Sequence, residues 1–164
     1  MAIKDVSNGR TDLYKLDPRI LKIKPNWNNR DFTTPENIAH VEELSLSIAQ
    51  NGVKKAIEVE WKDNEPYIVD GESRYRACML AIERGIDIKS VPVVLTDKYA
   101  NEADKLFVQI IGNSGKPFTQ LEQAKVFKKL LGLGWSQNDI ATKSGKTAGR
   151  VSQILELLTL PESV

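Results

Sequence analysis

The hydrophobic pattern of the chain changes once, near residue 100, and that change limits the fold more than any other feature. Before it, the segments AIEVEW, YIVD and VPVVLT have the alternating or continuous apolar pattern of short strands. From Asn101 onward every periodic segment has helical spacing. The pattern therefore predicts an α+β protein, with a flexible segment at 1–17, a small mixed α/β domain at 18–100 and an all-α domain at 101–164.

One long amphipathic helix is expected within the first domain. Thr34 suits its N-cap, Pro35 suits the first helical position, and Gly52 suits its end. A buried face at helical spacing is predicted for Ile38, Val41, Leu44 and Ile48.

Composition excludes several classes of protein. The 164 residues are 41% hydrophobic and 27% charged, which suits a folded chain rather than a disordered one. No apolar run is long enough for a membrane span, and MAIKDVSNGR lacks the apolar core of a signal peptide. The single cysteine, Cys78, indicates a reducing, cytoplasmic setting and a buried packing role. The single histidine, His40, is expected on the surface.

A cationic strand–turn–helix segment, YIVDGESRYRACML, is the first candidate site. Apolar residues before Asp70 predict a buried strand, and the residues after Gly71 predict a helix. Free N–H groups and the helix dipole make such a helix N-terminus favourable for anions. Arg74 and Arg76 add positive charge there, which favours a phosphate ligand. An ordinary i, i+4 pair of Glu72 with Arg76 on a solvated helix is the alternative.

Charge is distributed unevenly along the chain. Residues 114–150 contain seven lysines and arginines but only two acidic residues, whereas the remainder contains 16 basic and 20 acidic residues. A basic block in an otherwise slightly acidic chain is typical of a surface that contacts nucleic-acid phosphates. Solvated lysines on a helix face are the alternative.

The last two predicted helices have the spacing of a helix-turn-helix over 136–155. Ala141, Gly145 and Val151 follow the pattern A-x3-G-x5-V, in which the glycine takes a left-handed turn and the small and β-branched residues let the helices pack. Two packed helices without a DNA role are the alternative. The candidate DNA contacts are Lys143, Lys146, Thr147, Ala148, Arg150, Ser152 and Gln153.

Five segments, in order, resemble motifs of the ParB partition-protein family over residues 20–164. NWNNRDF is similar to its N-terminal arginine box, SIAQNGVKKAIEVE to its glycine–strand segment, and DGESRYRACMLA to its G-E-R-R-x-R-A phosphate motif. GNSGKPFTQLEQA is similar to its E-N-x-x-R…E-x-A motif, and the helix-turn-helix precedes LTLP, as in the family pattern L-x-L-P. The resemblance implies a ParB- and sulfiredoxin-like fold for the first domain.

The resemblance also implies ligands and partners. Family members bind CTP with Mg²⁺, bind a palindromic DNA site, and close two protomers into a clamp around DNA. For this chain it implies a homodimer, an inverted-repeat DNA site, a ParA-type ATPase partner and a nucleoid- or plasmid-associated location without membrane contact. The implied metal ligands are Glu72 and Asn113. The implied nucleotide-binding residues are Gly52, Ile57, Gly71, Glu72, Ser73, Arg74, Arg76 and Asn113.

Two positions depart from the family motifs. Ser73 stands where the family has an arginine, which removes one guanidinium from the phosphate site. Gly112 stands where the family has a glutamate, so we expect at most weak CTPase activity and assign no catalytic residue. The family's C-terminal dimerisation domain has no counterpart in the chain, which stops at Val164.

The residues leave more than one function open. The first is partition of a plasmid, phage or chromosome, and the second is a ParB-like transcriptional regulator or phage accessory DNA-binding protein. A nucleotide-dependent kinase on the same scaffold, with Glu72 as base, is a remote third, against which the helix-turn-helix argues. A sulfiredoxin-like enzyme needs a cysteine at the strand–helix turn, where this chain has Glu72 and Ser73.

Overall fold

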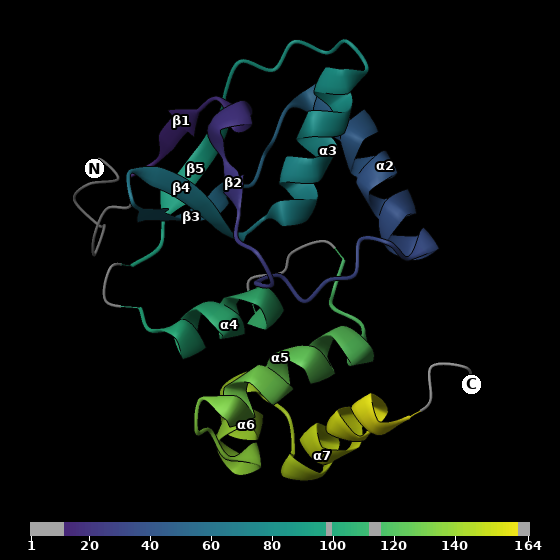
Figure 1. Cartoon of the computed structure of the whole chain (residues 1–164). Coiled ribbons are helices and arrows are strands. Elements are labelled where there is room, and N and C mark those ends of the chain that lie inside the picture. The colour runs from purple at the N-terminus through teal and green to yellow at the C-terminus, as the bar shows by residue number, and fades with distance from the viewer. Residues whose placement is uncertain (1–11, 98–99, 112–115, 161–164) are drawn as a thin grey trace, which may run out of the picture.

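The computed structural model describes residues 12–97, 100–111 and 116–160. Its first part is a five-stranded sheet with two helices beside it, and its second part consists of helices (Figure 1). The strands are β1 (Tyr14–Leu16), β2 (Lys22–Ile23), β3 (Ile57–Lys62), β4 (Glu65–Asp70) and β5 (Val91–Leu95), in the spatial order β1-β5-β3-β4-β2. The predicted strands β3, β4 and β5 are therefore confirmed.

The sheet is mixed, and its centre is a hairpin. β3 and β4 pair antiparallel across a turn at Asp63 and Asn64, which both have positive φ, as a tight two-residue hairpin requires. β5 pairs parallel with β3, and β2 pairs parallel with β4. β1 pairs antiparallel with β5, so the predicted flexible segment 1–17 extends too far and includes a strand.

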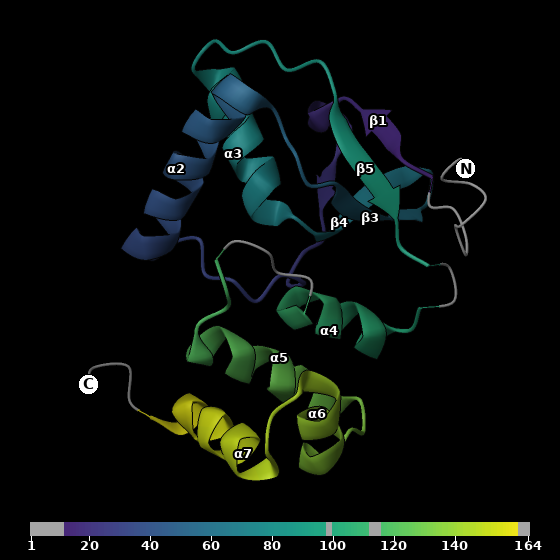
Figure 2. The same ribbon diagram turned by 180° about the vertical axis from the view of Figure 1, so that it is seen from behind.

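Two helices, α2 (Pro35–Asn51) and α3 (Glu72–Glu83), lie side by side next to the sheet (Figures 1 and 2). The Thr34 cap and the Gly52 end of α2 are confirmed. Cys78 on α3 is fully buried against the strands, and burial raises the pKa of its thiol to about 11. The predicted buried face of α2 is partly wrong, because Ile38 is 55% exposed while Asn37 is buried.

The helical part contains α4 (Glu102–Ile111), α5 (Gln120–Gly132), α6 (Gln137–Ser144) and α7 (Ala148–Glu156). Its hydrophobic cluster includes Phe107, Phe127 and Ile154, but also Trp27 from the segment after β2 and Val69 from β4. The helices therefore share a core with the sheet. No helix among the described residues has the length and apolar character needed to cross a membrane.

α6 and α7 form a tight helix–turn–helix pair. The Ser136 hydroxyl caps α6 by accepting from the Asp139 N–H, and Thr147 caps α7 in the same way. Gly145 ends α6 with φ 73°, the left-handed conformation predicted for it. Val151 is fully buried between the pair and α5, as its spacing predicts.

A buried carboxylate connects the beginnings of α2 and α5. Glu122 lies in the first turn of α5, where its side chain accepts from the Thr119 N–H in a capping box. The same side chain also accepts from the Asp31 N–H and the Asn37 amide, both at 3.0 Å. These contacts draw Asn37 inward and turn α2 so that Ile38 faces outward.

Candidate functional site

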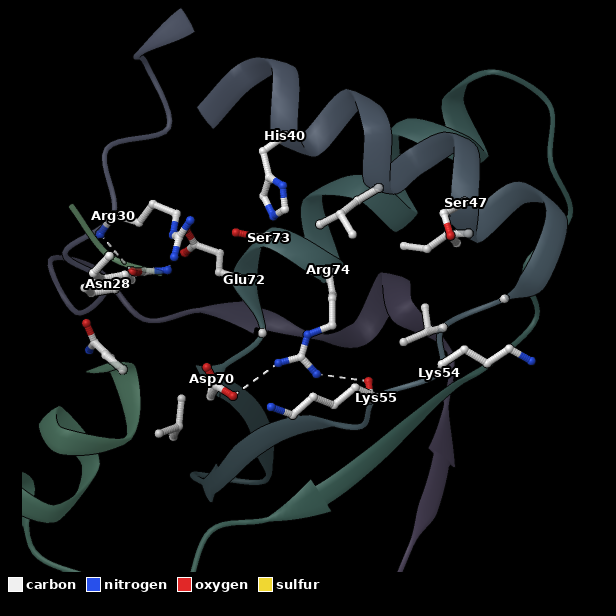
Figure 3. Close-up of a pocket in the computed structure, with 18 residues that line it drawn as sticks. Asn28, Arg30, His40, Ser47, Lys54, Lys55, Asp70, Glu72, Ser73 and Arg74 are labelled. Carbon is white, nitrogen blue, oxygen red and sulfur yellow. Dashed lines mark hydrogen bonds and ion pairs between the residues drawn. The ribbon is translucent and has the colours of Figure 1, made fainter. Parts of the chain in front are cut away.

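A cavity of about 300 Å³ lies at the N-terminus of α3, between α2, the β4–α3 turn and the segment after Gly52 (Figure 3). It includes four basic side chains and one histidine. Its lining residues from the segments before and within α2 are Asn28, Arg30, His40, Leu44, Ser47 and Ile48. The remaining lining residues are Gly52, Val53, Lys54, Lys55, Val69, Asp70, Gly71, Glu72, Ser73, Arg74, Gln109 and Phe118.

The floor of the cavity is the β4–α3 turn. Gly71 is the N-cap of α3 and has φ 110° and ψ 21°, a conformation that L side chains rarely adopt. It has no side chain to cap the helix, so the N–H groups of Glu72 and Ser73 are available to an external acceptor. The predicted strand–turn–helix is therefore confirmed, and anion binding by its turn stays a prediction.

Arg30 brings a positive charge to this cavity, and one of its guanidinium nitrogens has no hydrogen-bond partner among the described residues. The residue is only 6% exposed, and its guanidinium lies 4.8 Å from the Phe118 ring centroid. Nη2 donates to the Lys116 carbonyl oxygen at 2.6 Å, whereas Nη1 is buried and has no hydrogen-bond acceptor among the described residues. Burial lowers the pKa of Arg30 without making a guanidinium neutral. A buried donor of this kind favours an anionic ligand.

The two carboxylates of the turn are already bonded within the protein. Asp70 accepts from Arg74 Nη2 at 3.1 Å, and Glu72 accepts from Arg76 Nε at 3.2 Å and from the Asn28 amide. Burial raises the pKa of both carboxyl groups, and the neighbouring arginines oppose that shift. No group of three or more His, Cys, Asp or Glu side chains suited to a metal ion occurs among the described residues.

The structure brings together most, but not all, of the predicted nucleotide-binding residues. Ile57 does not reach the cavity, because it is fully buried in the sheet core. Arg76 does not line the cavity either, because its guanidinium lies 4.2 Å from the Phe32 ring centroid. Asn113 and Gly112 lie outside the described residues. The predicted residues that do line the cavity are Gly52, Gly71, Glu72, Ser73 and Arg74.

Sequence reasoning missed other lining residues. His40 is half-buried, and its ring is directed into the cavity (Figure 3), a position that its expected place on the surface did not specify. Burial, Arg30 and Lys116 lower the pKa of His40. Arg30 lies within the NWNNRDF segment, so that motif was the available signal for it. Lys54 and Lys55 follow Gly52 after one intervening residue, Val53, and lie within the SIAQNGVKKAIEVE segment, so that motif was the available signal for them.

The predicted DNA-contact residues are divided between two environments. Arg150 and Gln153 are exposed on α7, where Arg150 Nη1 lies 3.4 Å from Gln153 Oε1. Lys146, Ala148 and Ser152 are only half-buried. The exposed Lys143 and Thr147 complete the predicted set, and Lys143 also borders a groove beside α4. Arg150 and Gln153 are therefore the predicted contacts on α7 that are exposed.

A mixed sheet with a cationic strand–turn–helix cavity, joined to a helical unit, places the chain among ParB-like α/β proteins. A family model described as the ParB N-terminal domain matches residues 5–114. The chain therefore belongs to the ParB N-terminal domain family.

Curated relatives are similar along most of this chain. The probable chromosome-partitioning protein ParB of Treponema pallidum is 29% identical over 161 residues, which cover 96% of this chain and 46% of the relative. The probable chromosome 1-partitioning protein ParB of Deinococcus radiodurans is 35% identical over 139 residues, which cover 84% and 45% respectively. The chain spans slightly less than half the length of these relatives.

Two solved structures of Caulobacter crescentus ParB are also similar. The C-terminally truncated protein complexed with CTP-gamma-S matches with a TM-score of 0.51 and 29% identity, covering 93% of this chain and 81% of the other. The same protein complexed to the centromeric parS site matches with a TM-score of 0.60 and 26% identity, covering 91% and 73%.

Proposed function

We propose that this chain binds CTP in the cavity at the α3 N-terminus and binds an inverted-repeat DNA site through α6 and α7. In this proposal it acts in partition, as a clamp on DNA whose closure depends on the nucleotide. The observation that carries the nucleotide part is the buried Arg30 guanidinium, whose Nη1 has no acceptor in the part of the chain that the structure describes and which lines the same cavity as the N-terminus of α3. The similarity to the CTP-gamma-S complex of Caulobacter ParB supports CTP as the ligand.

The proposed nucleotide site uses three kinds of donor. The turn offers the N–H groups that follow Gly71 and the Ser73 hydroxyl, and Arg30 offers a guanidinium N–H. Lys54 adds a mobile point charge at the cavity rim. Together these groups compensate for the arginine that Ser73 replaces. Gly52 and the adjacent α2 residues are left to contact the sugar or the base.

In this proposal Mg²⁺ binds together with the nucleotide and not to the protein alone. No cluster of three or more His, Cys, Asp or Glu side chains suited to a metal occurs in the described part of the chain, and Mg²⁺ is commonly held by substrate phosphates together with one or two protein ligands. Glu72 and Asn113 are the candidate protein ligands, of which Asn113 lies outside the described residues. When bound, the ion would neutralise phosphate charge.

The proposed DNA site rests on α7. Arg150 and Gln153 are exposed on its outer face, and Thr147 begins the helix at the end expected to meet the duplex. Lys143 and Lys146 lie on either side of the turn, where contacts to backbone phosphates are common. The similarity to Caulobacter ParB complexed to parS supports this assignment. A two-fold DNA site implies a homodimer, and a partition role implies a ParA-type ATPase partner and a location on a nucleoid or plasmid.

Isothermal titration calorimetry tests the nucleotide part of the proposal. The chain is titrated with CTP, ATP, GTP and UTP in the presence of Mg²⁺, and CTP is expected to bind most tightly. Arg30→Ala is expected to weaken CTP binding by at least about tenfold, the usual cost of a charge-assisted contact. Arg19→Ala is the matched control, because Arg19 is an exposed arginine outside the cavity. Absence of CTP binding, or equal binding by the Arg30→Ala protein, would sink the nucleotide assignment.

A further inference from the structure

Gln109, a buried residue of α4, is hydrogen-bonded to the segment that carries Arg30. Its Oε1 accepts from the Asn29 side-chain amide at 2.9 Å and from the Asn29 backbone N–H at 3.2 Å. Its Nε2 donates to the Trp27 carbonyl oxygen at 2.9 Å. Gln109 is 3% exposed and Asn29 is 6% exposed. One side-chain amide on α4 therefore holds the backbone at residues 27 and 29, on both sides of Asn28.

These bonds need a donor and an acceptor on one side chain. The partners determine which end of the Gln109 amide is which, because a backbone N–H faces Oε1 and a backbone carbonyl oxygen faces Nε2. An ionised carboxylate at position 109 could not donate to Trp27, and a lysine could not accept from Asn29. An apolar side chain there would deprive the buried Asn29 N–H of its acceptor, which costs stability.

The segment that Gln109 holds places two side chains at the cavity. Asn28 and Arg30, which flank Asn29, both line it (Figure 3), and the Arg30 N–H donates to Asn28 Oδ1 at 2.9 Å. The guanidinium end of Arg30 is held by its bond to the Lys116 carbonyl oxygen. The backbone end of Arg30 is held through Asn29 by Gln109. A shift of the backbone at residue 29 would therefore move the guanidinium relative to the α3 N-terminus.

We propose that Gln109 is a positioning residue of the nucleotide site, which acts on the phosphates through Arg30. The helix that carries Gln109 is itself anchored, because Leu106 and Phe107 of α4 lie in the same hydrophobic cluster as Trp27. The shared core therefore holds the Arg30 segment in place before a ligand arrives, and a donor held in this way loses less conformational entropy on binding. This inference rests on the proposed function for the identity of the ligand.

Hydrogen exchange without any ligand tests whether Gln109 holds the segment. Gln109→Met keeps most of the side-chain volume but removes the amide, and the amides of residues 28–31 are expected to exchange about tenfold faster than in the unmodified chain. Lys105→Ala is the matched control, because Lys105 lies on the same helix in an ion pair with Glu60, outside the cavity. It should leave exchange over 28–31 unchanged. Unchanged exchange over 28–31 in the Gln109→Met protein would overturn the proposal.

A milder variant keeps the proposal testable if Gln109→Met does not fold. Asn29→Ala loses the side-chain bond to Gln109 but retains the backbone N–H that donates to Oε1. Exchange over 28–31 is expected to rise in this variant by about threefold, less than in Gln109→Met. Circular dichroism establishes whether each variant has the helix content of the unmodified chain. A folded Asn29→Ala protein with unchanged exchange would then overturn the proposal.

A double-mutant cycle then separates positioning from direct contact with the nucleotide. CTP affinity in the presence of Mg²⁺ is measured by competition against a fluorescent CTP analogue. Gln109→Met is expected to weaken CTP binding about fivefold, and Lys105→Ala is expected to leave it unchanged. In the Arg30→Ala protein, which lacks the positioned group, Gln109→Met is expected to cost less than about twofold. An equal penalty with and without Arg30 would overturn the proposal, because Gln109 would then act on the nucleotide directly or on the fold as a whole.

The exchange and binding experiments separate failure of this inference from failure of the proposed function. If the unmodified chain does not bind CTP, the proposed function is wrong, and the ligand-free exchange of residues 28–31 still decides whether Gln109 holds that segment. If CTP binds and exchange over 28–31 is unaffected by Gln109→Met, the function stands and the positioning role is wrong.

Discussion

Trp27 Nε1 donates a hydrogen bond to the carbonyl oxygen of Val69 at 3.1 Å, and both side chains lie in the hydrophobic cluster of the helical part. The indole therefore connects β4 to α4 and α5 through one residue of the segment after β2. Lys129 Nζ, on α5, also donates to the Asn26 carbonyl oxygen at 2.7 Å. The sheet and the helices are consequently one packed unit rather than two units on a flexible linker.

Substitution of Trp27 tests this shared core. Trp27→Ala is expected to lower the free energy of unfolding by about 3–5 kcal/mol, because a large buried ring is removed. Trp27→Phe keeps most of the apolar surface but loses the hydrogen bond, so a loss of about 1 kcal/mol is expected. Urea unfolding is followed by circular dichroism and by exchange in β4 and α5. Loss of the helices alone, with β4 still protected, would contradict a shared core.

The folded state is expected to lose stability in acid partly through His40. Burial and the nearby Arg30 and Lys116 lower its pKa, while Glu43 on the same helix opposes them. The unfolded chain therefore binds the proton more readily, so the His40 contribution to the free energy of unfolding falls as the pH drops below about 6.5. Glu72 and Asp70, whose carboxyl pKa values are raised, contribute in the opposite direction.

His40→Gln isolates the histidine contribution from the carboxylates. Urea unfolding of the unmodified chain and of the variant is compared near pH 5.5 and near pH 7.5. The variant is expected to gain stability relative to the unmodified chain only at the lower pH. Identical pH profiles for the two proteins would show that His40 does not titrate in a cationic environment.

Sequence patterns predicted the local features of this fold because those features depend on neighbouring residues. The Thr34 cap, the Gly145 turn and the β3–β4 hairpin each need only a few adjacent residues, and all three are present. β1 and β2 were not predicted, because each has at most three residues and pairs with a strand more than 40 positions away. The outward face of Ile38 likewise depends on distant Glu122.

In the candidate site, too, local features were predictable from the sequence, whereas features that depend on distant residues were not. The Gly71 turn follows from its position between a strand and a helix, and the structure places it at the cavity. The direction of Arg74 depends on carbonyl acceptors 18 and 19 residues earlier, which no local pattern encodes. The direction of His40 into the cavity was not predicted for the same reason, since its neighbours Arg30 and Lys116 come from separate segments.

Arg150→Ala and Lys146→Ala are expected to affect DNA binding differently. If Arg150 contacts a guanine, its loss costs about 1–3 kcal/mol at one base pair and relaxes specificity there. Loss of Lys146 is expected to weaken all duplexes alike and to reduce the salt slope by about 1. Binding is measured by fluorescence anisotropy after selection from randomised duplexes. Lys62→Ala, on β3, is the control.

An outcome without sequence preference would contradict the DNA assignment. If selection enriches no inverted repeat and neither variant changes duplex binding at low salt, α6 and α7 serve only to pack on α5. The Lys62→Ala protein should retain the affinity of the unmodified chain in either case.

CTP turnover is expected to be slow even when CTP is bound. Gly112 supplies no carboxylate where the family motif has a glutamate, and phosphoryl transfer depends on positioned charge and metal. Gly112→Glu is expected to raise phosphate release more than it tightens CTP binding. Release is measured with a phosphate sensor, and several turnovers per minute by the unmodified chain would contradict the prediction.

Both edges of the five-stranded sheet come from the same short stretch of sequence. β1 covers the outer side of β5, and β2 covers the outer side of β4. Both β1 and β2 lie within residues 14–23. A fragment that starts at residue 24 would therefore uncover two rows of unpaired backbone groups at once. Uncovered strand edges pair readily with other chains. Trimming the N-terminus at the apparent domain boundary would expose one such edge on β5 and favour self-association, whereas a cut before Tyr14 would leave both edges protected.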